Sequence, residues 1–169
     1  MRFTRSPALR AAILAAACAA ASGANAIEVG QPLPLASLPA ADSGDVALVD
    51  GKARATYIDF WASWCGPCRH SFPWMNQMQR KFGAQGLRIV AINLDAKRVD
   101  AKDFLAQIPA SFDLAYDSRG EAARKFGVAT MPSSVLVGAD GKVIVVHQGF
   151  RDEDEPVLEA DIAAALGHR

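Results

Sequence analysis

The residues most able to do chemistry in this sequence are Cys65 and Cys68, which lie two residues apart in the stretch YIDFWASWCGPCRH. Such a pair can attach a haem, form a structural disulfide, bind a metal or exchange electrons. A c-type haem site needs histidine directly after the second cysteine, and position 69 is arginine, which excludes that use. A structural disulfide across so short a loop would constrain the unfolded chain very little.

Metal binding is the next alternative. A structural zinc site needs four ligands, and His70, His147 and His168 are too scattered along the sequence to complete one with the two thiolates. We therefore expect no zinc site and no other resident metal. Copper(I) prefers soft thiolates and can be held by two of them, so a copper-binding chaperone stays open as an alternative.

Redox exchange fits the surroundings of the pair best. The apolar run before Cys65 predicts a strand, and Gly66-Pro67 predicts the start of a helix, because proline is tolerated in a helix's first turn. The helix N-terminus would stabilise a Cys65 thiolate, the attacking species, and Cys68 would lie one turn further on, within reach to resolve a mixed disulfide. Pro67 removes one amide N–H from the turn, so the thiolate is less stabilised, which favours a reductant.

A lone acid, Asp59, lies in the middle of the predicted strand between Ile58 and Phe60. Burying an unpaired carboxylate is costly, and burial raises the pKa of the acid. An acid with a raised pKa is suited to taking and giving a proton. Its position six residues before the cysteine pair favours proton transfer; the alternative is an acid that faces water or is satisfied by backbone donors.

Strands and helices alternate around these residues. We expect an extended lead-in over 27–45, and the Asp-Gly in GADGK predicts a hairpin. Strands are predicted at 56–61, 87–94, 112–116, 134–137 and 143–147, and helices at 66–82, 100–107, 118–126 and 156–166. Pro73 lies inside the first helix and should kink it. This order of elements indicates the α/β class.

The first 26 residues have the parts of a secretory signal peptide. Three arginines precede the apolar run 11–21, which is followed by Ala24-Asn25-Ala26. We expect cleavage after Ala26, since the run is far shorter than the roughly 20 residues of a membrane-spanning helix. Retention as an anchor is one alternative. Lipidation of Cys18 is another, although Leu14 lies one place too far upstream for a lipobox.

The remaining segment, 27–169, is long enough for one domain and too short for two ordinary ones. Cleavage would remove three of the 18 basic residues and none of the 18 acidic ones, which leaves a small negative charge. No basic cluster survives, so we expect no binding to nucleic acid. Cys18 would also be lost. An exported protein with a single CxxC pair is not a disulfide-stapled scaffold.

The stretch YIDFWASWCGPC, together with Pro73 and the later ATMPSSVLV, resembles the thioredoxin superfamily over about 55–166. The resemblance implies a thioredoxin-like fold, with a central mixed β-sheet flanked by helices. It implies that Cys65 is the nucleophile, Cys68 the resolving thiol and Asp59 the buried proton carrier. It also implies a cis peptide bond before Pro132. Substrate contacts are expected at Trp64, Gly66, Pro67, Met131 and Pro132.

The distance from Cys68 to Pro132 is longer than in a plain thioredoxin, and it accommodates an extra helix and strand at about 95–116. With the signal peptide and the N-terminal extension VGQPLP, the chain resembles the exported TlpA/ResA-type reductases. That group often has Asn at the position of Asp59 and Glu at that of Ser71, so the subfamily stays open.

The resemblance implies a periplasmic thiol–disulfide oxidoreductase with no cofactor other than the Cys65–Cys68 disulfide. Its substrates would be disulfides of exported proteins, such as apocytochrome c or the thiols of copper sites, and a membrane thiol donor would keep it reduced. A disulfide oxidase or isomerase remains an alternative, as does the copper-binding chaperone.

Overall fold

A five-stranded sheet with the order β5-β4-β3-β6-β7 is central to the structure, a computed structural model that describes residues 27–167. The predicted signal peptide lies outside the described residues. β3 (Ala55–Trp61), β4 (Leu87–Asn93) and β5 (Asp113–Tyr116) are parallel, whereas β6 (Ser133–Gly138) is antiparallel to β3 and β7 (Val143–Gln148) to β6. Every residue of β3 is buried, as expected for a strand covered on both faces.

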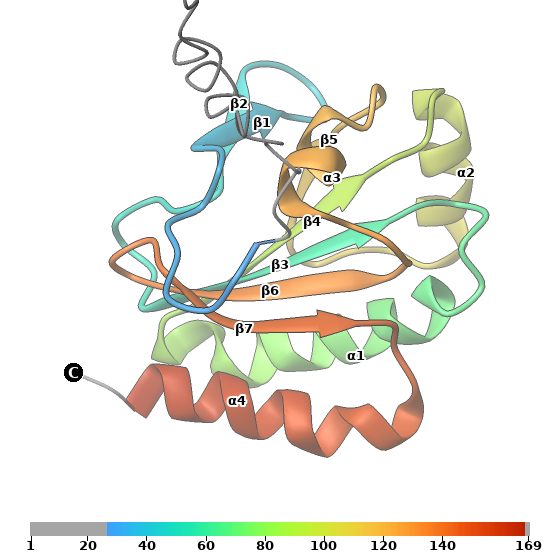
Figure 1. Cartoon of the computed structure of the whole chain (residues 1–169). Coiled ribbons are helices and arrows are strands. Elements are labelled where there is room, and N and C mark those ends of the chain that lie inside the picture. Colours follow the sequence, from blue (N-terminus) through green and yellow to red (C-terminus); the bar gives the residue numbers. More distant parts are fainter. Residues whose placement is uncertain (1–26, 168–169) are drawn as a thin grey trace, which may run out of the picture.

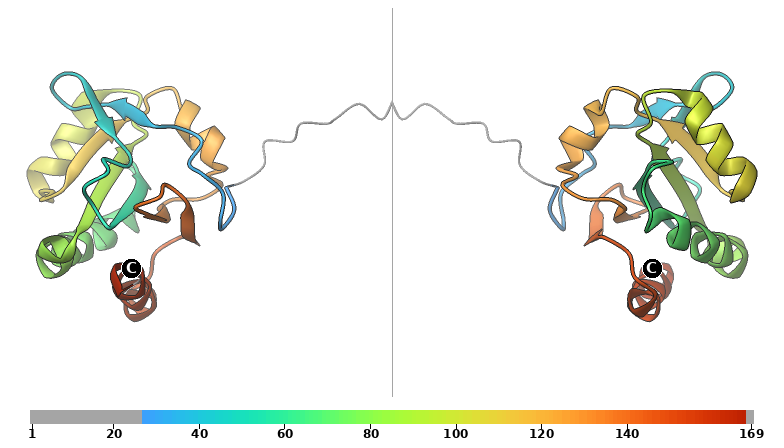
Figure 2. Two further views of the ribbon diagram at one scale, coloured as in Figure 1. Left: turned by 90° about the vertical axis from the view of Figure 1, so that its left-hand side faces the viewer. Right: turned by 90° about the vertical axis from the view of Figure 1, so that its right-hand side faces the viewer.

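Helices cover both faces of this sheet (Figure 1). α1 (Cys68–Phe82) and α4 (Glu155–Gly167) lie on one face, and α3 (Glu121–Phe126) lies on the other with the hairpin of β1 (Ser37–Pro39) and β2 (Asp45–Ala47), as the side views also show (Figure 2). The remaining elements are α2 (Arg98–Gln107) and the short 3-10 turns η1 (Gly83–Gln85) and η2 (Asp152–Asp154). None of the helices within 27–167 is long and apolar enough to span a bilayer.

The alternation of β3 divides its side chains between two cores. Tyr57 and Trp61 belong to the core beneath α1 and α4, where the ring of Trp61 lies 4.7 Å from that of Phe72. Ile58 and Phe60 belong to the core beneath α3 and the hairpin. Asp59 has the same parity as Tyr57 and Trp61, so it faces the first core.

The sequence predicted the five strands of the sheet to within one or two residues at most ends. α2 and β5 are the extra helix and strand expected at about 95–116. α1 begins at Cys68 rather than at Gly66, so Cys65 precedes the helix, and α1 continues through Pro73.

Two predictions about local structure are wrong. The lead-in over 27–45 is not merely extended, because it forms β1 and runs into β2. α3 begins at Glu121 rather than at Ser118, because Gly120 adopts a left-handed conformation with φ of 65° that ends the preceding turn. The carboxylate of Asp117 then accepts the N–H groups of Glu121 and Ala123, at 2.8 and 2.9 Å, and so caps α3.

The N-terminal segment contacts both edge strands of the sheet. Near β7, the N–H of Gly30 donates to Val143 and the N–H of Val143 donates to Gln31, at 2.8 and 2.9 Å. At the opposite edge of the sheet, Ala40 forms an antiparallel bridge with Ala115 of β5. One stretch of chain therefore contacts both edge strands.

Candidate functional site

Cys65 and Cys68 form a disulfide at the carboxyl end of β3. Cys65 lies in the loop between β3 and α1, and Cys68 is the first residue of α1. The backbone N–H of Cys68 donates to the Sγ of Cys65 at 3.3 Å. The helix N-terminus therefore points a donor at the first sulfur, and this donor would stabilise a thiolate after reduction of the disulfide.

The two sulfurs differ in access. Cys65 lines an open groove with a volume of about 530 Å³, whereas Cys68 is completely buried. The groove is bounded by three loops and by one side of α3. Its lining residues are Trp64, Cys65, Gly66, Pro67, Leu94, Ala123, Val128, Ala129, Thr130 and Met131. An incoming disulfide can therefore reach Cys65 along this groove.

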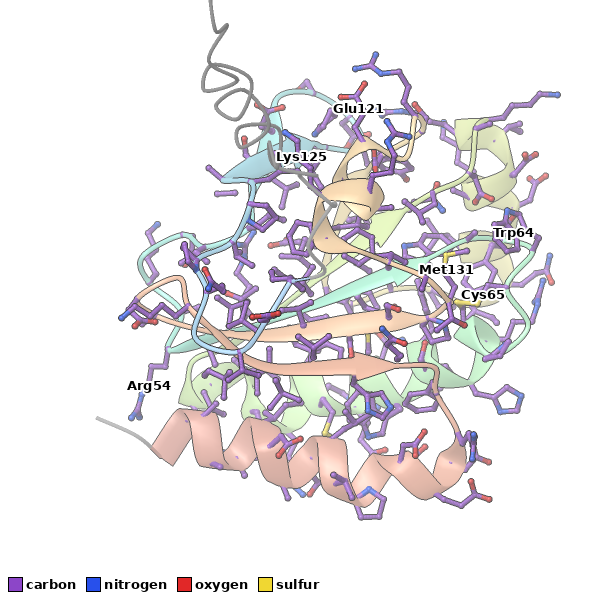
Figure 3. All side chains as sticks on the ribbon, viewed as in Figure 1. Arg54, Trp64, Cys65, Glu121, Lys125 and Met131 are labelled. Carbon is purple, nitrogen blue, oxygen red and sulfur yellow. A yellow bond between two sulfur atoms is a disulfide. The ribbon has the colours of Figure 1, made fainter. Side chains whose placement is uncertain are left out.

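The structure brings together the residues that the resemblance predicted for substrate contact. Trp64 is 70% exposed beside Cys65, and Met131 lies close to both, at the same end of the sheet (Figure 3). Gly66 and Pro67 line the same groove. The peptide bond between Met131 and Pro132 is cis, which confirms that prediction, and Pro132 is buried.

The loop that carries Trp64 and Cys65 is fixed by Asp95, a residue that the sequence analysis did not single out. Its buried carboxylate accepts the backbone N–H of Ser63 at 3.0 Å, the hydroxyl of Ser63 at 2.9 Å and the amide of Asn93 at 2.8 Å. A signal was available, because Asp95 lies two residues past the end of a buried parallel strand whose carboxyl end lies beside that of β3.

Asp59 is 1% exposed, so the alternative in which it faces water is wrong. Its Oδ2 makes no hydrogen bond with the described residues. Burial raises the pKa of the Asp59 carboxyl well above its ordinary value of 3.8. A carboxyl in this environment holds a proton more readily than an exposed one, and a residue that takes up and releases protons in catalysis needs this property.

The two described histidines lie beside aspartates. Nδ1 of His70 lies 3.6 Å from Asp152, and Nε2 of His147 lies 3.5 Å from Asp154, while His168 is outside the described residues. Within 27–167 no group of three or more His, Cys, Asp and Glu side chains is placed to hold a metal ion. Binding of copper(I) by Cys65 and Cys68 stays an untested alternative.

Comparison with known proteins agrees with this geometry. The Redoxin family profile matches residues 28–162. The chain is 30% identical over 129 residues to the thiol-disulfide oxidoreductase ResA of Bacillus thuringiensis subsp. konkukian. The aligned residues cover 76% of this chain and 75% of that protein. It is 27% identical over 132 residues to ResA of Bacillus subtilis, covering 78% of this chain and 74% of that protein.

A solved structure shares the fold and half of the sequence. A Chlorobium tepidum protein, named as a thiol:disulfide interchange protein DsbE, superposes with a TM-score of 0.80 and 51% identity. The match covers 84% of this chain and all of that one. The family profile, the relatives and the solved structure thus agree on thiol–disulfide chemistry and on a thioredoxin-like fold.

Proposed function

This chain belongs to the Redoxin family, as a thioredoxin-superfamily protein of the ResA/TlpA type, and from that premise we propose that it reduces disulfides of exported proteins. Thiol–disulfide oxidoreductase activity follows from its relatives and from the Cys65–Cys68 disulfide. The proposal adds the direction of electron flow, the substrate class and the roles of the residues.

One observation carries the proposal: of the two sulfurs, only that of Cys65 lines the groove, while Cys68 is buried behind it. In the reduced protein the Cys65 thiolate attacks a substrate disulfide, forms a mixed disulfide and releases one substrate thiolate. The Cys68 sulfur then attacks Cys65, and the second substrate sulfur leaves with the electron pair. Asp59 takes the proton that Cys68 loses in this step.

The residues between the cysteines support reduction rather than oxidation. Pro67 has no N–H, and the hydrogen bond to Cys65 Sγ comes from Cys68. A strong oxidant needs a strongly stabilised thiolate at the first cysteine, since this stabilises its reduced form. A turn with one donor fewer stabilises the thiolate less, so the dithiol gives up its electrons more readily.

The remaining parts of the proposal concern place and partners. A signal peptide over 1–26, cleaved after Ala26, would deliver the protein to the periplasm. There its substrates are disulfide-containing exported proteins, such as apocytochrome c or the thiols of copper sites. A membrane thiol donor returns Cys65 and Cys68 to the reduced state, so no cofactor is needed besides this pair.

The test is the reduction potential of the Cys65–Cys68 couple, measured by equilibration with glutathione or dithiothreitol. We expect a value near that of thioredoxin, about −270 mV. A value near that of the strong oxidant DsbA, about −120 mV, would reverse the direction of electron flow and make the protein a disulfide oxidase.

A further inference from the structure

Asp59 is enclosed on the face of the sheet that α1 and α4 cover, and sheet register defines its neighbours. Ala91 of β4 pairs with it on one side and Ser134 of β6 on the other. Ala91 offers no polar atom, so the hydroxyl of Ser134 is the polar side chain that the register places beside Asp59. A carboxyl that exchanges a proton in every cycle needs such a neighbour to connect it with water.

Tyr57 adds a second hydroxyl on the same face. It lies two residues before Asp59 on the same face and is 3% exposed, and its hydroxyl lies near that of Ser134. Burial, and then the nearby charge of Asp59, raise the pKa of the Tyr57 phenol, so the phenol keeps its proton. Each hydroxyl can both donate and accept a hydrogen bond, which is what a proton relay requires.

A small cavity adjoins these two hydroxyls beneath α4. Its volume is about 10 Å³, close to the smallest space that holds one water molecule. The cavity is lined by Tyr57, Ser134, Leu136, Val145, His147, Leu158 and Asp161. Four of these residues, Tyr57, Ser134, His147 and Asp161, have polar side chains, and a buried water needs two to four polar partners.

His147 lies at the outer side of the cavity. It pairs with Ser134 across β6 and β7, and its side chain is 27% exposed. Its Nε2 is buried and makes no hydrogen bond with the described residues, while Asp154 Oδ2 lies 3.5 Å away. The titratable groups that face it are Asp154 of η2, Asp161 of α4 and Tyr57 of β3. One imidazole thus connects the cavity with the surface.

We propose that the proton exchanged by Asp59 travels beneath α4, through the hydroxyls of Tyr57 and Ser134 and one water, to His147 at the surface. The proposal rests on the proposed role of Asp59 in the resolving step. In that step the Cys65–Cys68 bond forms, the bond from Cys65 to the substrate sulfur breaks, and the electron pair leaves with the substrate. The Cys68 proton passes to Asp59 and then outward along this route.

The test uses the reduced protein and 5,5′-dithiobis(2-nitrobenzoate). Release of the first thionitrobenzoate reports attack by Cys65, and release of the second reports resolution by Cys68. Since thionitrobenzoate leaves as an anion, it does not take up the Cys68 proton, which must pass to the protein. Both phases are followed between about pH 5 and pH 9 in the wild-type protein, in His147→Gln and in the control His70→Gln.

The control is closely matched, because His70 also lies beside an aspartate of η2, at 3.6 Å from Asp152, but its side chain is 66% exposed and lines no part of the cavity. We expect His147→Gln to slow the second phase about tenfold at pH 7 and to leave the first phase unchanged. Added imidazole should restore part of the lost rate. His70→Gln should leave both phases unchanged.

Two results would overturn the route. If the second phase of His147→Gln matches that of His70→Gln at every pH, the proton leaves by another way. If both phases slow together without rescue by imidazole, His147 has only a structural role.

Tyr57→Phe provides a second test if His147→Gln fails to fold, because it removes one hydroxyl and keeps the ring that packs on Trp74. It should also slow only the second phase, and an unchanged second phase would contradict the route. Asp59→Asn separates the two proposals. If the second phase of Asp59→Asn has the wild-type rate, the role of Asp59 itself is refuted. If Asp59→Asn slows the second phase but Tyr57→Phe and His147→Gln do not, only the route is refuted.

Discussion

The two faces of the central strand β3 differ in their buried titratable side chains, although one strand supplies both faces. Toward α3 and the β1–β2 hairpin, β3 presents Ile58 and Phe60. Toward α1 and α4, the same strand presents Tyr57 and Asp59, which lie between larger apolar residues. On β6, Val135 faces the core beneath α3 and the hairpin, whereas Ser134 faces the core beneath α1 and α4.

The contrast separates stability from chemistry. Apolar burial stabilises the fold, whereas a buried polar atom without a partner costs free energy. The Oδ2 of Asp59, which has no hydrogen-bond partner among residues 27–167, lies on the same face as Cys68, the fully buried member of the disulfide. We infer that the face toward α1 and α4 gives up some stability for proton transfer, whereas burial of Ile58 and Phe60 on the opposite face only stabilises the fold.

The largest expected effect comes from the cysteines, at the face of the sheet that α1 and α4 cover. Cys65→Ser should abolish turnover of insulin reduction, because the attacking sulfur is lost. Cys68→Ser should instead accumulate mixed disulfides, since nothing resolves them, and these can be captured from cells and separated on non-reducing gels. If Cys68→Ser captures no partner, the two-step exchange is wrong.

The next largest effect is expected from a substitution on the face toward α3 and the β1–β2 hairpin. Phe60 is completely buried and its ring lies 5.1 Å from that of Phe126. Phe60→Ala should lower the free energy of unfolding by about 3–5 kcal/mol, measured by urea denaturation. The exchange rate of the molecules that remain folded should not change. A slower rate in the folded fraction would mean that the two faces are not independent.

Asp59→Asn should combine opposite changes in one variant. We expect resolution by Cys68 to slow by about tenfold or more, because an amide cannot take up the proton. The variant should also be more stable at neutral pH, by about 1–3 kcal/mol, since an uncharged amide is less costly to bury than a carboxylate. A slow variant with no added stability would argue against the cost assigned to this face.

The pH dependence of stability tests the same carboxyl without relying on kinetics. Because burial raises the pKa of folded Asp59 above 3.8, the folded state holds a proton that the unfolded state has lost between these two pKa values. The free energy of unfolding therefore falls as pH rises through this window, by at most about 1.4 kcal/mol per pH unit. Asp59→Asn lacks this loss, so its advantage over the wild-type protein should be smallest near pH 4 and grow with pH. Parallel curves would contradict the raised pKa.

The smallest effect is expected from the ion pair between α1 and α4. Lys81 of α1 forms an ion pair with Glu159 of α4, and both side chains are partly exposed. Lys81→Ala should lower the free energy of unfolding by no more than about 1 kcal/mol, with Lys142→Ala as a control on the β6–β7 hairpin. A larger loss would mean that charge, and not apolar packing, holds the two helices over Asp59.

The sequence predicted the fold wherever local pattern and tertiary contact agree. The apolar runs that become β3 and β4 are long, buried and bounded by clear turn residues. The β1–β2 hairpin was not predicted, because its three-residue strands contain no alternating pattern and depend on contact with β5. The start of α3 was misplaced because Asp117 and Gly120 together form a turn before the helix begins.

The residues of the candidate site that lie close together in the sequence could be predicted. Cys65, Cys68 and Asp59 lie within ten residues, and the resemblance added Pro132. Tyr57, Ser134 and His147 were not identified as a group, because no spacing connects residues so far apart in the chain. Only the register of β3, β6 and β7 brings them onto one face.

The N-terminal segment that touches both β7 and β5 has a consequence for how these molecules behave when concentrated. Edge strands expose unpaired backbone groups that can pair with another chain and start aggregation. Here residues 30–31 occupy backbone groups of Val143, and Ala40 bridges to β5. A chain shortened from Ile27 through β2 would keep its cysteines but lose these contacts with both edges, so it should self-associate through its strands, which light scattering would detect.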